Sequence, residues 1–171
     1  PTQFADSASL DPTHITALKA VKLTNNYIAL NHGDLAMFAT LFFGILDPDS
    51  GSLSYINGGH EPLLIVGSSG GVKEHLSFTG PAVGIESEID FKIQQTHLES
   101  GDILLGYTDG VTEAGASDGA FFTMEHLVSI LDTPASTATE LLDRIASSLH
   151  EHVGGADQFD DITMLAIRRI P

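Results

Sequence analysis

The sequence contains no cysteine and no tryptophan, and positively charged residues are scarce. Without cysteine there is no disulfide, no thiolate nucleophile and no cysteine-based zinc site. Seven lysines and arginines stand against 23 aspartates and glutamates, which gives a formal net charge of −16. Because that charge repels phosphate backbones and anionic lipids, nucleic acid and membrane surfaces are excluded as the main partners.

Long hydrophobic runs are also missing, so the sequence predicts no membrane span, and no signal peptide is recognisable. Hydrophobic residues make up 42% of the chain and charged residues 18%, which is too apolar for a disordered acidic tail. The length of 171 residues suits one domain, so we expect residues 1–171 to form a single domain.

Hydrophobic periodicity predicts one helix, about six strands, two helices and a last strand. The first helix begins at Asp11 and Pro12, a capping residue and a good first helical residue, and runs to about Leu30. The expected strands are 37–46, 52–57, 62–66, 72–76, 91–98, 103–107 and 162–167, and the later helices are 123–131 and 136–153. Because strands and helices are segregated and short turns join the strands, the pattern favours an α+β fold with antiparallel sheets.

Three aspartates lie at the ends of apolar strands. Asp109 follows the strand 103–107 and is followed by Gly110, whereas Asp160 and Asp161 precede the last strand. Oxygen-ligand sites for Mg²⁺ or Mn²⁺ are commonly built in this way. Aspartate followed by glycine is also a common turn, and spacing alone favours the turn over the metal site.

The histidines and one acidic loop give weaker signals. His60, which follows two glycines, is more often a packed loop residue than a ligand when it stands alone. No two histidines are four residues apart, so a helical zinc motif is absent. We expect the remaining histidines to be solvated: His14, His32, His75, His97, His126, His150 and His152. Asp47-x-Asp49-x-Gly51 lacks the later glutamate of a calcium loop and predicts a hairpin turn.

Six segments, in this order, carry a specific resemblance. They are 37–41 (MFATL), 57–62 (NGGHEP), 80–85 (GPAVGI), 100–105 (SGDILL), 107–114 (YTDGVTEA) and 160–163 (DDIT). Together they resemble the PP2C-like phosphatases of the bacterial stage II sporulation protein E and RsbU type. The resemblance covers residues 10–169, which is nearly the whole chain.

The resemblance implies an αββα sandwich, in which two antiparallel sheets are flanked by helices. It also implies a metal-dependent protein serine/threonine phosphatase with two Mn²⁺ or Mg²⁺ ions held by aspartates and water. In such a site a metal-activated water attacks phosphorus without a covalent phosphoenzyme. This chemistry requires neither a cysteine nor an activated serine.

Matching the motifs residue by residue assigns the expected roles. Asp109 and Asp160 correspond to metal-binding aspartates, and Asp161 to a carboxylate that stabilises the loop or supports the ligands. Gly110 lets the backbone pass close to the metals. His60 and Asn57 belong to a motif for which we expect a structural role in its loop.

The chain departs from the family pattern in one respect. The family begins with a strand carrying Gly-Asp-x-x-Asp and continues with Gly-Asp-x-x-Gly-x-Gly, and neither motif is present. Gly33-Asp34 follows a helix and does not fit. We therefore expect the C-terminal portion of a phosphatase domain, without its N-terminal strand or strands and first helix. Such a chain should bind metal weakly and turn over slowly, and its exposed sheet edges favour a homodimer.

By resemblance, the substrate is a phosphorylated bacterial signalling protein such as an anti-sigma-factor antagonist, the location is cytoplasmic, and an upstream sensor or receiver domain controls activity. The alternative is a catalytically inactive PP2C-like module that binds or regulates a partner. An unrelated acidic, β-rich binding protein leaves the six ordered motifs unexplained.

Overall fold

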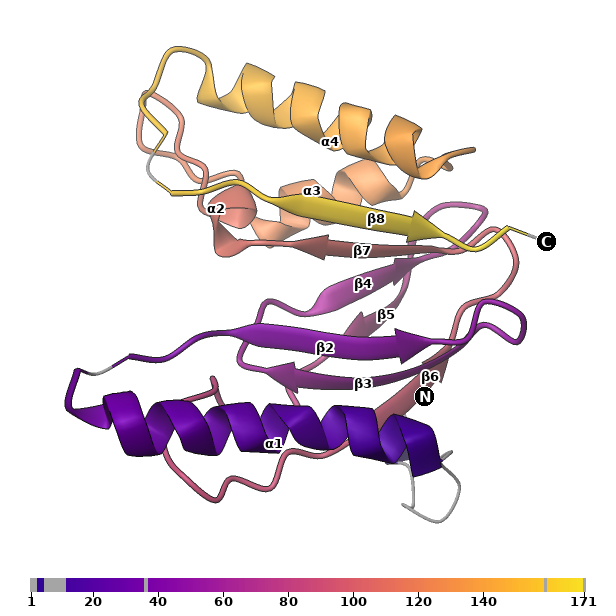
Figure 1. Ribbon diagram of the computed structural model, residues 1–171. Helices are drawn as coiled ribbons and strands as arrows, with labels where there is room; N and C mark the ends of the chain where they lie inside the picture. Colours follow the sequence, from indigo (N-terminus) through magenta and orange to yellow (C-terminus); the bar gives the residue numbers. More distant parts are fainter. Residues whose placement is uncertain (1–2, 5–11, 36, 159, 171) are drawn as a thin grey trace. The chain divides into compact units, whose positions relative to one another are not determined.

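The computed structural model describes residues 3–4, 12–35, 37–158 and 160–170 (Figure 1). The chain divides into two compact units. The first unit comprises Pro1–Pro62 and Ser77–His97, and the second comprises Leu63–Leu76 and Leu98–Pro171. Each unit contains one four-stranded antiparallel sheet and its own helices, so each is described by itself.

The first unit has the strand order β1-β6-β3-β2. Its strands are β1 (Gln3–Phe4), β2 (Leu41–Leu46), β3 (Ser52–Gly58) and β6 (Gln94–His97), and its helices are α1 (Pro12–His32) and the short 3₁₀ helix η1 (Gly33–Leu35). Helix α1 contributes Leu18 and Val21 to a buried cluster with Ile56, Val83 and Phe91. This cluster is the core of the unit.

A buried asparagine joins α1 to the loop before β6. Asn25 is fully buried. Its side-chain Nδ2 donates to the carbonyl of Glu86 (2.9 Å), and its Oδ1 accepts from the amide of Gly84 (2.9 Å). Because a buried polar side chain must have hydrogen-bond partners, these two bonds fix the loop against the helix.

The turn between β2 and β3 is the hairpin turn predicted for Asp47. Asp47 Oδ1 accepts from the amides of Asp49 (2.9 Å) and Ser50 (3.3 Å), and Oδ2 accepts from the Ser50 hydroxyl (2.8 Å). These bonds, that from the hydroxyl first, lower the pKa of the Asp47 carboxyl below its ordinary value. Gly51 ends the turn at φ +82°, a backbone conformation that glycine adopts without strain.

The second unit has the strand order β5-β4-β7-β8. Its strands are β4 (Leu63–Val66), β5 (Val72–Leu76), β7 (Ile103–Tyr107) and β8 (Met164–Arg168), and its helices are α2 (Asp109–Thr112), α3 (Met124–Leu131) and α4 (Ala138–Val153). Leu64 and Leu105 from the sheet pack with Leu127, Leu141 and Ile145 from α3 and α4, all fully buried. The two long helices therefore cover one face of this sheet (Figure 1).

Threonine caps begin both long helices of this unit. The side chain of Thr123 accepts from the amide of His126 (3.4 Å), and that of Thr137 accepts from the amide of Glu140 (3.0 Å). The Glu140 carboxylate in turn accepts from the amide of Ser136 (2.7 Å). Each cap satisfies an amide that has no partner within its helix.

The predicted α+β class, with two antiparallel sheets and flanking helices, is confirmed. The pairing is less local than a run of hairpins, because β3 also pairs with β6 and β4 with β7. The strand expected from residue 37 begins only at Leu41, since residues 37–40 are exposed and pair through Ala39 and Val83 alone. The expected cap at Asp11 lies outside the described residues. The single domain over 1–171 stays a prediction.

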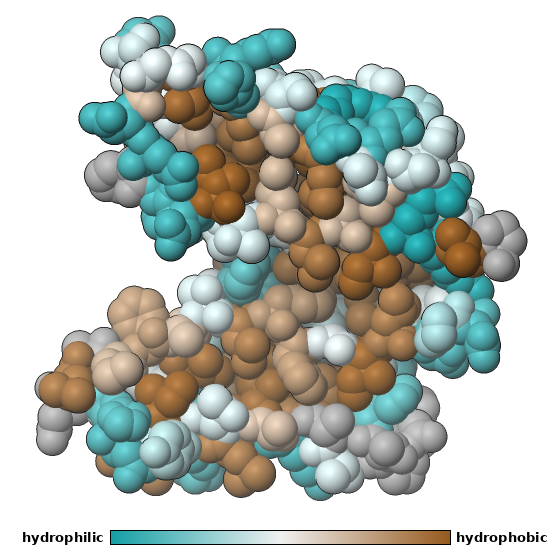
Figure 2. Space-filling view, turned by 45° about the horizontal axis from the view of Figure 1, so that its top comes forward, coloured by the Kyte–Doolittle hydropathy of each residue, from teal (hydrophilic) through white to brown (hydrophobic). Residues whose placement is uncertain are grey.

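Large hydrophobic side chains also remain at the surface, and Figure 2 shows broad hydrophobic areas on one side of the molecule. In the first unit they include Leu23, Tyr27, Leu30, Leu35, Met37 and Phe38, and in the second Phe121, Leu165, Ile167 and Ile170. Within the described ranges, no helix has the length and apolar character that a membrane crossing requires.

An ion pair between buried Asp102 and half-exposed Lys73 lies where two turns of the second unit meet. The Asp102 side chain is 2% exposed, and its Oδ2 accepts from Lys73 Nζ (2.5 Å) and from the amide of Glu99 (2.9 Å). Its Oδ1 accepts from the amide of Ser68 (3.3 Å). The carboxylate therefore holds both the β4–β5 turn and the turn before β7.

We predict that Asp102→Ala lowers the free energy of unfolding by about 1–3 kcal/mol, because it removes the acceptor of three part-buried hydrogen bonds. Lys73 is half-exposed and regains water, which keeps the loss from being larger. The matched change Asp143→Ala, at an exposed position of α4, should alter stability by no more than about 0.5 kcal/mol. Urea unfolding measures both changes, and equal effects would contradict this account.

Candidate functional site

Two loops of the second unit carry the acidic motifs. Strand β7 ends at Tyr107 and is followed by Thr108 and by Asp109, the first residue of α2. The other loop contains Asp160 and leads into β8 at Met164. Because β7 and β8 are antiparallel, with Tyr107 opposite Met164, the end of one strand lies beside the start of the other.

Thr108 bonds the two loops to each other. Its amide donates to the carbonyl of Thr163 (3.0 Å), and its hydroxyl donates to the carbonyl of Asp161 (2.8 Å). The same hydroxyl oxygen accepts from the amide of Thr163 (3.0 Å). Three hydrogen bonds from one residue therefore hold the Asp109 loop against the Asp160 loop.

Gly110 allows this close approach. It is buried, and a Cβ added to it would lie 2.6 Å from the carbonyl oxygen of Asp161 and 3.5 Å from the carbonyl carbon of Asp160. The first distance is shorter than side-chain carbons tolerate, and the obstructing atom is backbone. The absence of a side chain at Gly110 therefore lets the two backbones touch.

Asp109 and Asp160 hold their carboxylates in the same way. Asp109 Oδ1 accepts from the amide of Gly110 (3.0 Å), and Asp160 Oδ1 accepts from the amide of Asp161 (2.7 Å). Both aspartates are exposed, as is Asp161. Among the described residues neither Oδ2 has a hydrogen-bond donor, so both are available to water or a cation.

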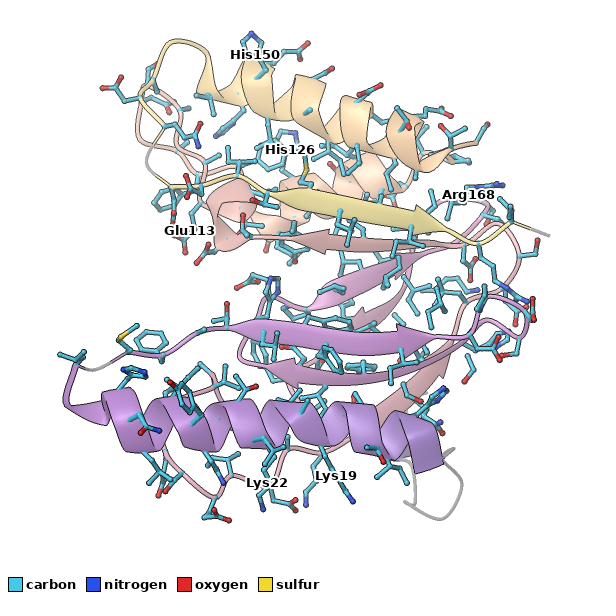
Figure 3. The ribbon with its side chains drawn as sticks, viewed as in Figure 1. Lys19, Lys22, Glu113, His126, His150 and Arg168 are labelled. Atoms are coloured by element: carbon cyan, nitrogen blue, oxygen red, sulfur yellow. The ribbon has the colours of Figure 1, made fainter. Side chains whose placement is uncertain are left out.

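A pocket of about 50 Å³ lies beside Asp160. Its lining includes Glu113, which Figure 3 labels, together with Asp157 and Gln158. Gln158 Nε2 donates to the carbonyl of Asp160 (2.7 Å). A space of this size holds water but not a peptide.

The carboxylate oxygens of Asp109 and Asp160 are ligands of the type that a hard divalent cation prefers, but they are too few to bind one alone. Carboxylate oxygens are the ligands that Mg²⁺ and Mn²⁺ prefer, and such ions take about six of them. Within the described residues, no three histidine, aspartate or glutamate side chains converge in a geometry that could hold a metal ion. The carboxylates of Asp109 and Asp160 by themselves are too few to fill such a coordination sphere.

His60 lies in the first unit, in the loop after β3. Its amide donates to Asn57 Oδ1 (2.9 Å), and its ring Nδ1 lies 2.9 Å from the carbonyl of Glu61. Because a carbonyl only accepts, Nδ1 carries the proton and Nε2 of the neutral ring is an acceptor. These bonds join His60 to the end of β3 and to the next residue of the loop, and the role of His60 stays a prediction.

Two other histidines contact an aromatic ring, although His126 is exposed, as expected of a solvated residue. The ring of His126 stacks on Phe122 at 4.3 Å between centroids, and that of half-buried His152 meets Phe122 edge-on at 5.4 Å. His126 Nε2 also lies 3.3 Å from Ser148 Oγ. His126, labelled in Figure 3, belongs to α3 and His152 to α4, so only the packing of the two helices brings these rings together.

Sequence reasoning assigned no role to Thr108, although the residue is part of the quoted Tyr-Thr-Asp-Gly motif. Glu113 and Asp157 were likewise not singled out, and both line the pocket beside Asp160. The position of Thr108 next to Asp109 was the one available signal. Its contacts with a loop 53 residues further along the chain cannot be read from local pattern.

The family model for stage II sporulation protein E (SpoIIE) matches residues 8–170. Among curated proteins, Protein IcfG of Synechocystis sp. is 51% identical over 152 residues, which are 89% of this chain and 24% of IcfG. Phosphoserine phosphatase RsbU of Bacillus subtilis is 29% identical over 94% of this chain and 48% of RsbU. The chain therefore spans about half or less of the length of these curated relatives.

Solved structures show the same fold. The SiaA-PP2C domain of Pseudomonas aeruginosa superposes with a TM-score of 0.73 at 20% identity. The match covers 91% of this chain and 64% of that one. At this identity the likeness establishes the PP2C-like fold and nothing finer.

We predict that Gly110→Ala destabilises the protein by about 1–3 kcal/mol, because its Cβ meets the Asp161 carbonyl and forces the two loops apart. Gly115→Ala is the matched control, since a Cβ there meets nothing within 4 Å. Urea unfolding of both variants measures the difference. A Gly110→Ala protein as stable as Gly115→Ala would show that the loops are not in backbone contact.

Proposed function

Because the chain belongs to the SpoIIE family of PP2C-like phosphatases, we propose that it forms part of a metal-dependent protein serine/threonine phosphatase. The observation that carries the proposal is the meeting of two motifs at one end of the β7–β8 pair. There Asp109 and Asp160 lie in loops that Thr108 bonds together. Both carboxylates are exposed, as binding of a hydrated cation requires.

In this proposal Asp109 and Asp160 would hold Mn²⁺ or Mg²⁺, for which their Oδ2 atoms are available. Their Oδ1 atoms stay bonded to the amides of Gly110 and Asp161, which orients each carboxylate. When bound, such ions lower the pKa of a coordinated water and offset the charge of the phosphoryl oxygens. Asp161 faces solvent beside them and supports the loop through its carbonyl.

We further propose that polypeptide outside these residues completes the metal site. Two aspartates are too few for two ions, and the sequence contains no Gly-Asp-x-x-Asp. The position of β8 supports this idea, because β8 is the last strand of its sheet and no described strand pairs with its outer edge. The free backbone N–H and C=O groups of a sheet edge can pair with a further strand, from the same polypeptide or from a second copy.

The substrate class follows from the relatives. RsbU is named a phosphoserine phosphatase, and we propose a phosphoserine or phosphothreonine protein of bacterial signalling as the substrate here. An anti-sigma-factor antagonist fits this substrate class. We propose that a sensor or receiver domain in the full-length phosphatase controls its activity. The net charge of −16 disfavours a strongly acidic partner.

A second candidate is a PP2C-like module that binds a partner without hydrolysis. One observation favours it: no three metal-ligating side chains converge in the part of the chain that the structure describes. The presence of both Asp109 and Asp160 at one edge favours the enzyme, because a purely binding module has no need of paired exposed carboxylates.

We predict Mn²⁺-dependent phosphate release from a phosphoserine peptide by these residues joined to the natural sequence that precedes them. Asp109→Asn or Asp160→Asn in that protein should lower kcat by about 100-fold or more, because each removes a metal ligand. Asp143→Asn, on the exposed side of α4, is the matched control and should leave kcat unchanged. The 171-residue chain alone should release little phosphate.

Three results would change this account. No release by the extended protein at any Mn²⁺ concentration would favour the binding module. Equal rates for Asp109→Asn and Asp143→Asn would show that Asp109 is not a ligand. Rapid Mn²⁺-dependent release by the 171-residue chain would show that its site is complete.

A further inference from the structure

We propose that the hydroxyl of Thr108 is a positioning group that sets the separation of Asp109 and Asp160. The inference rests on the proposed function, because it concerns the metal site that these two aspartates would share. It goes further by assigning the metal-binding geometry to a neutral side chain that touches neither a metal nor a substrate.

One hydroxyl makes both side-chain bonds between the loops. Thr108 Oγ1 donates its proton to the Asp161 carbonyl (2.8 Å) and accepts the Thr163 amide (3.0 Å). Asp161 follows Asp160, and Thr108 precedes Asp109. The bond to Asp161 therefore joins the two residues next to the proposed ligands, and the bond from Thr163 holds the same loop three residues after Asp160.

The position of Thr108 makes these bonds unexpected. Thr108 is the N-cap residue of α2, and N-cap threonines ordinarily accept a hydrogen bond from an amide in the first turn. Here the side chain makes no capping bond. The amide of Gly110 bonds to Asp109 Oδ1, and that of Val111 to the Thr108 carbonyl. Local preferences are commonly given up where a site requires it.

The chemistry of the bonds restricts which side chains can replace threonine. A hydroxyl can donate one hydrogen bond and accept others at the same atom, which serine also does and valine does not. Thr108 is half-buried, and Asp161 and Thr163 are exposed, so water can reach the groups that valine would leave unpaired. Loss of the hydroxyl should therefore loosen the two loops without unfolding the unit.

Gly110 complements Thr108. The hydroxyl draws the loops together, and the bare Cα of Gly110 lets the backbones approach until the Asp161 carbonyl would lie 2.6 Å from a Cβ. The backbone contact at Gly110 prevents a closer approach of the loops, and the hydrogen bonds of Thr108 prevent their separation. Together they fix the Asp109 loop relative to the Asp160 loop. In the proposed site, a cation held by both carboxylates would meet two loops whose relative position is already set.

The test is the Mn²⁺ affinity of the 171-residue chain. Water-proton relaxation measures this affinity, and the method also detects weak binding. Thr108→Val should weaken binding roughly 10-fold, as loss of a supporting hydrogen bond does at metal sites. Thr108→Ser should bind Mn²⁺ with the affinity of the unaltered chain, because serine keeps the hydroxyl. Thr139→Val, on the exposed face of α4, is the matched control and should change nothing.

A second measurement needs no metal. Amide hydrogen exchange should accelerate at Thr163 in Thr108→Val and not in Thr108→Ser, since only valine removes the acceptor of that amide. Exchange at Leu105 and Leu141, in the core of the unit, should stay slow in both variants. Faster exchange throughout the unit would mean that Thr108 only stabilises the fold, and would overturn the proposal.

Asp109→Asn distinguishes a failure of the proposed metal site from a failure of the positioning role of Thr108. If the unaltered chain binds no Mn²⁺ even when joined to the natural sequence that precedes it, or if Asp109→Asn binds Mn²⁺ equally well, the proposed metal site is wrong and the inference is wrong with it. If Asp109→Asn loses binding but Thr108→Val keeps the full affinity, the metal site stands and the positioning role alone is refuted.

Discussion

The antiparallel pairing of β7 with β8 is the constraint on which the candidate site depends. It places the residue after Tyr107 beside the residue before Met164, although these strands are separated by three helices in the chain. Two acidic motifs that are each an ordinary turn by themselves thereby become neighbours. The core beneath them, formed by the sheet with α3 and α4, keeps the two strand ends in register.

Several elements were predictable because their signal is local. Strands β7 and β5 and the hairpin at Asp47 agree with periodicity and turn chemistry. Helix α2 was missed, since four residues show no helical period. The expected start of β2 at residue 37 was wrong because hydrophobic residues can also lie in an exposed loop. Pairings such as β3 with β6 depend on contacts far apart in sequence, which local patterns do not encode.

The candidate site also has residues that were predicted from the sequence and residues that were not. Asp109 and Asp160 were found from motifs that the chain shares with a known family, and the structure places both on neighbouring loops. The hydrogen bonds of Thr108 could not be predicted, because its partners are distant in sequence and only the fold brings them close. The contact of His126 with His152 was missed for the same reason, as it arises where α3 packs on α4. Residue types that carry chemistry are thus easier to predict than those that position them.

The central claim is that Asp109 and Asp160 bind the same kind of cation side by side. The most direct test is the paramagnetic broadening of backbone amide signals when Mn²⁺ is added to the chain in small steps. Signals of Gly110 and Asp161 should broaden together at the lowest Mn²⁺ concentrations, before those of other acidic segments such as Glu86 and Glu88. Broadening of only one loop, or equal broadening at every acidic segment, would contradict the claim.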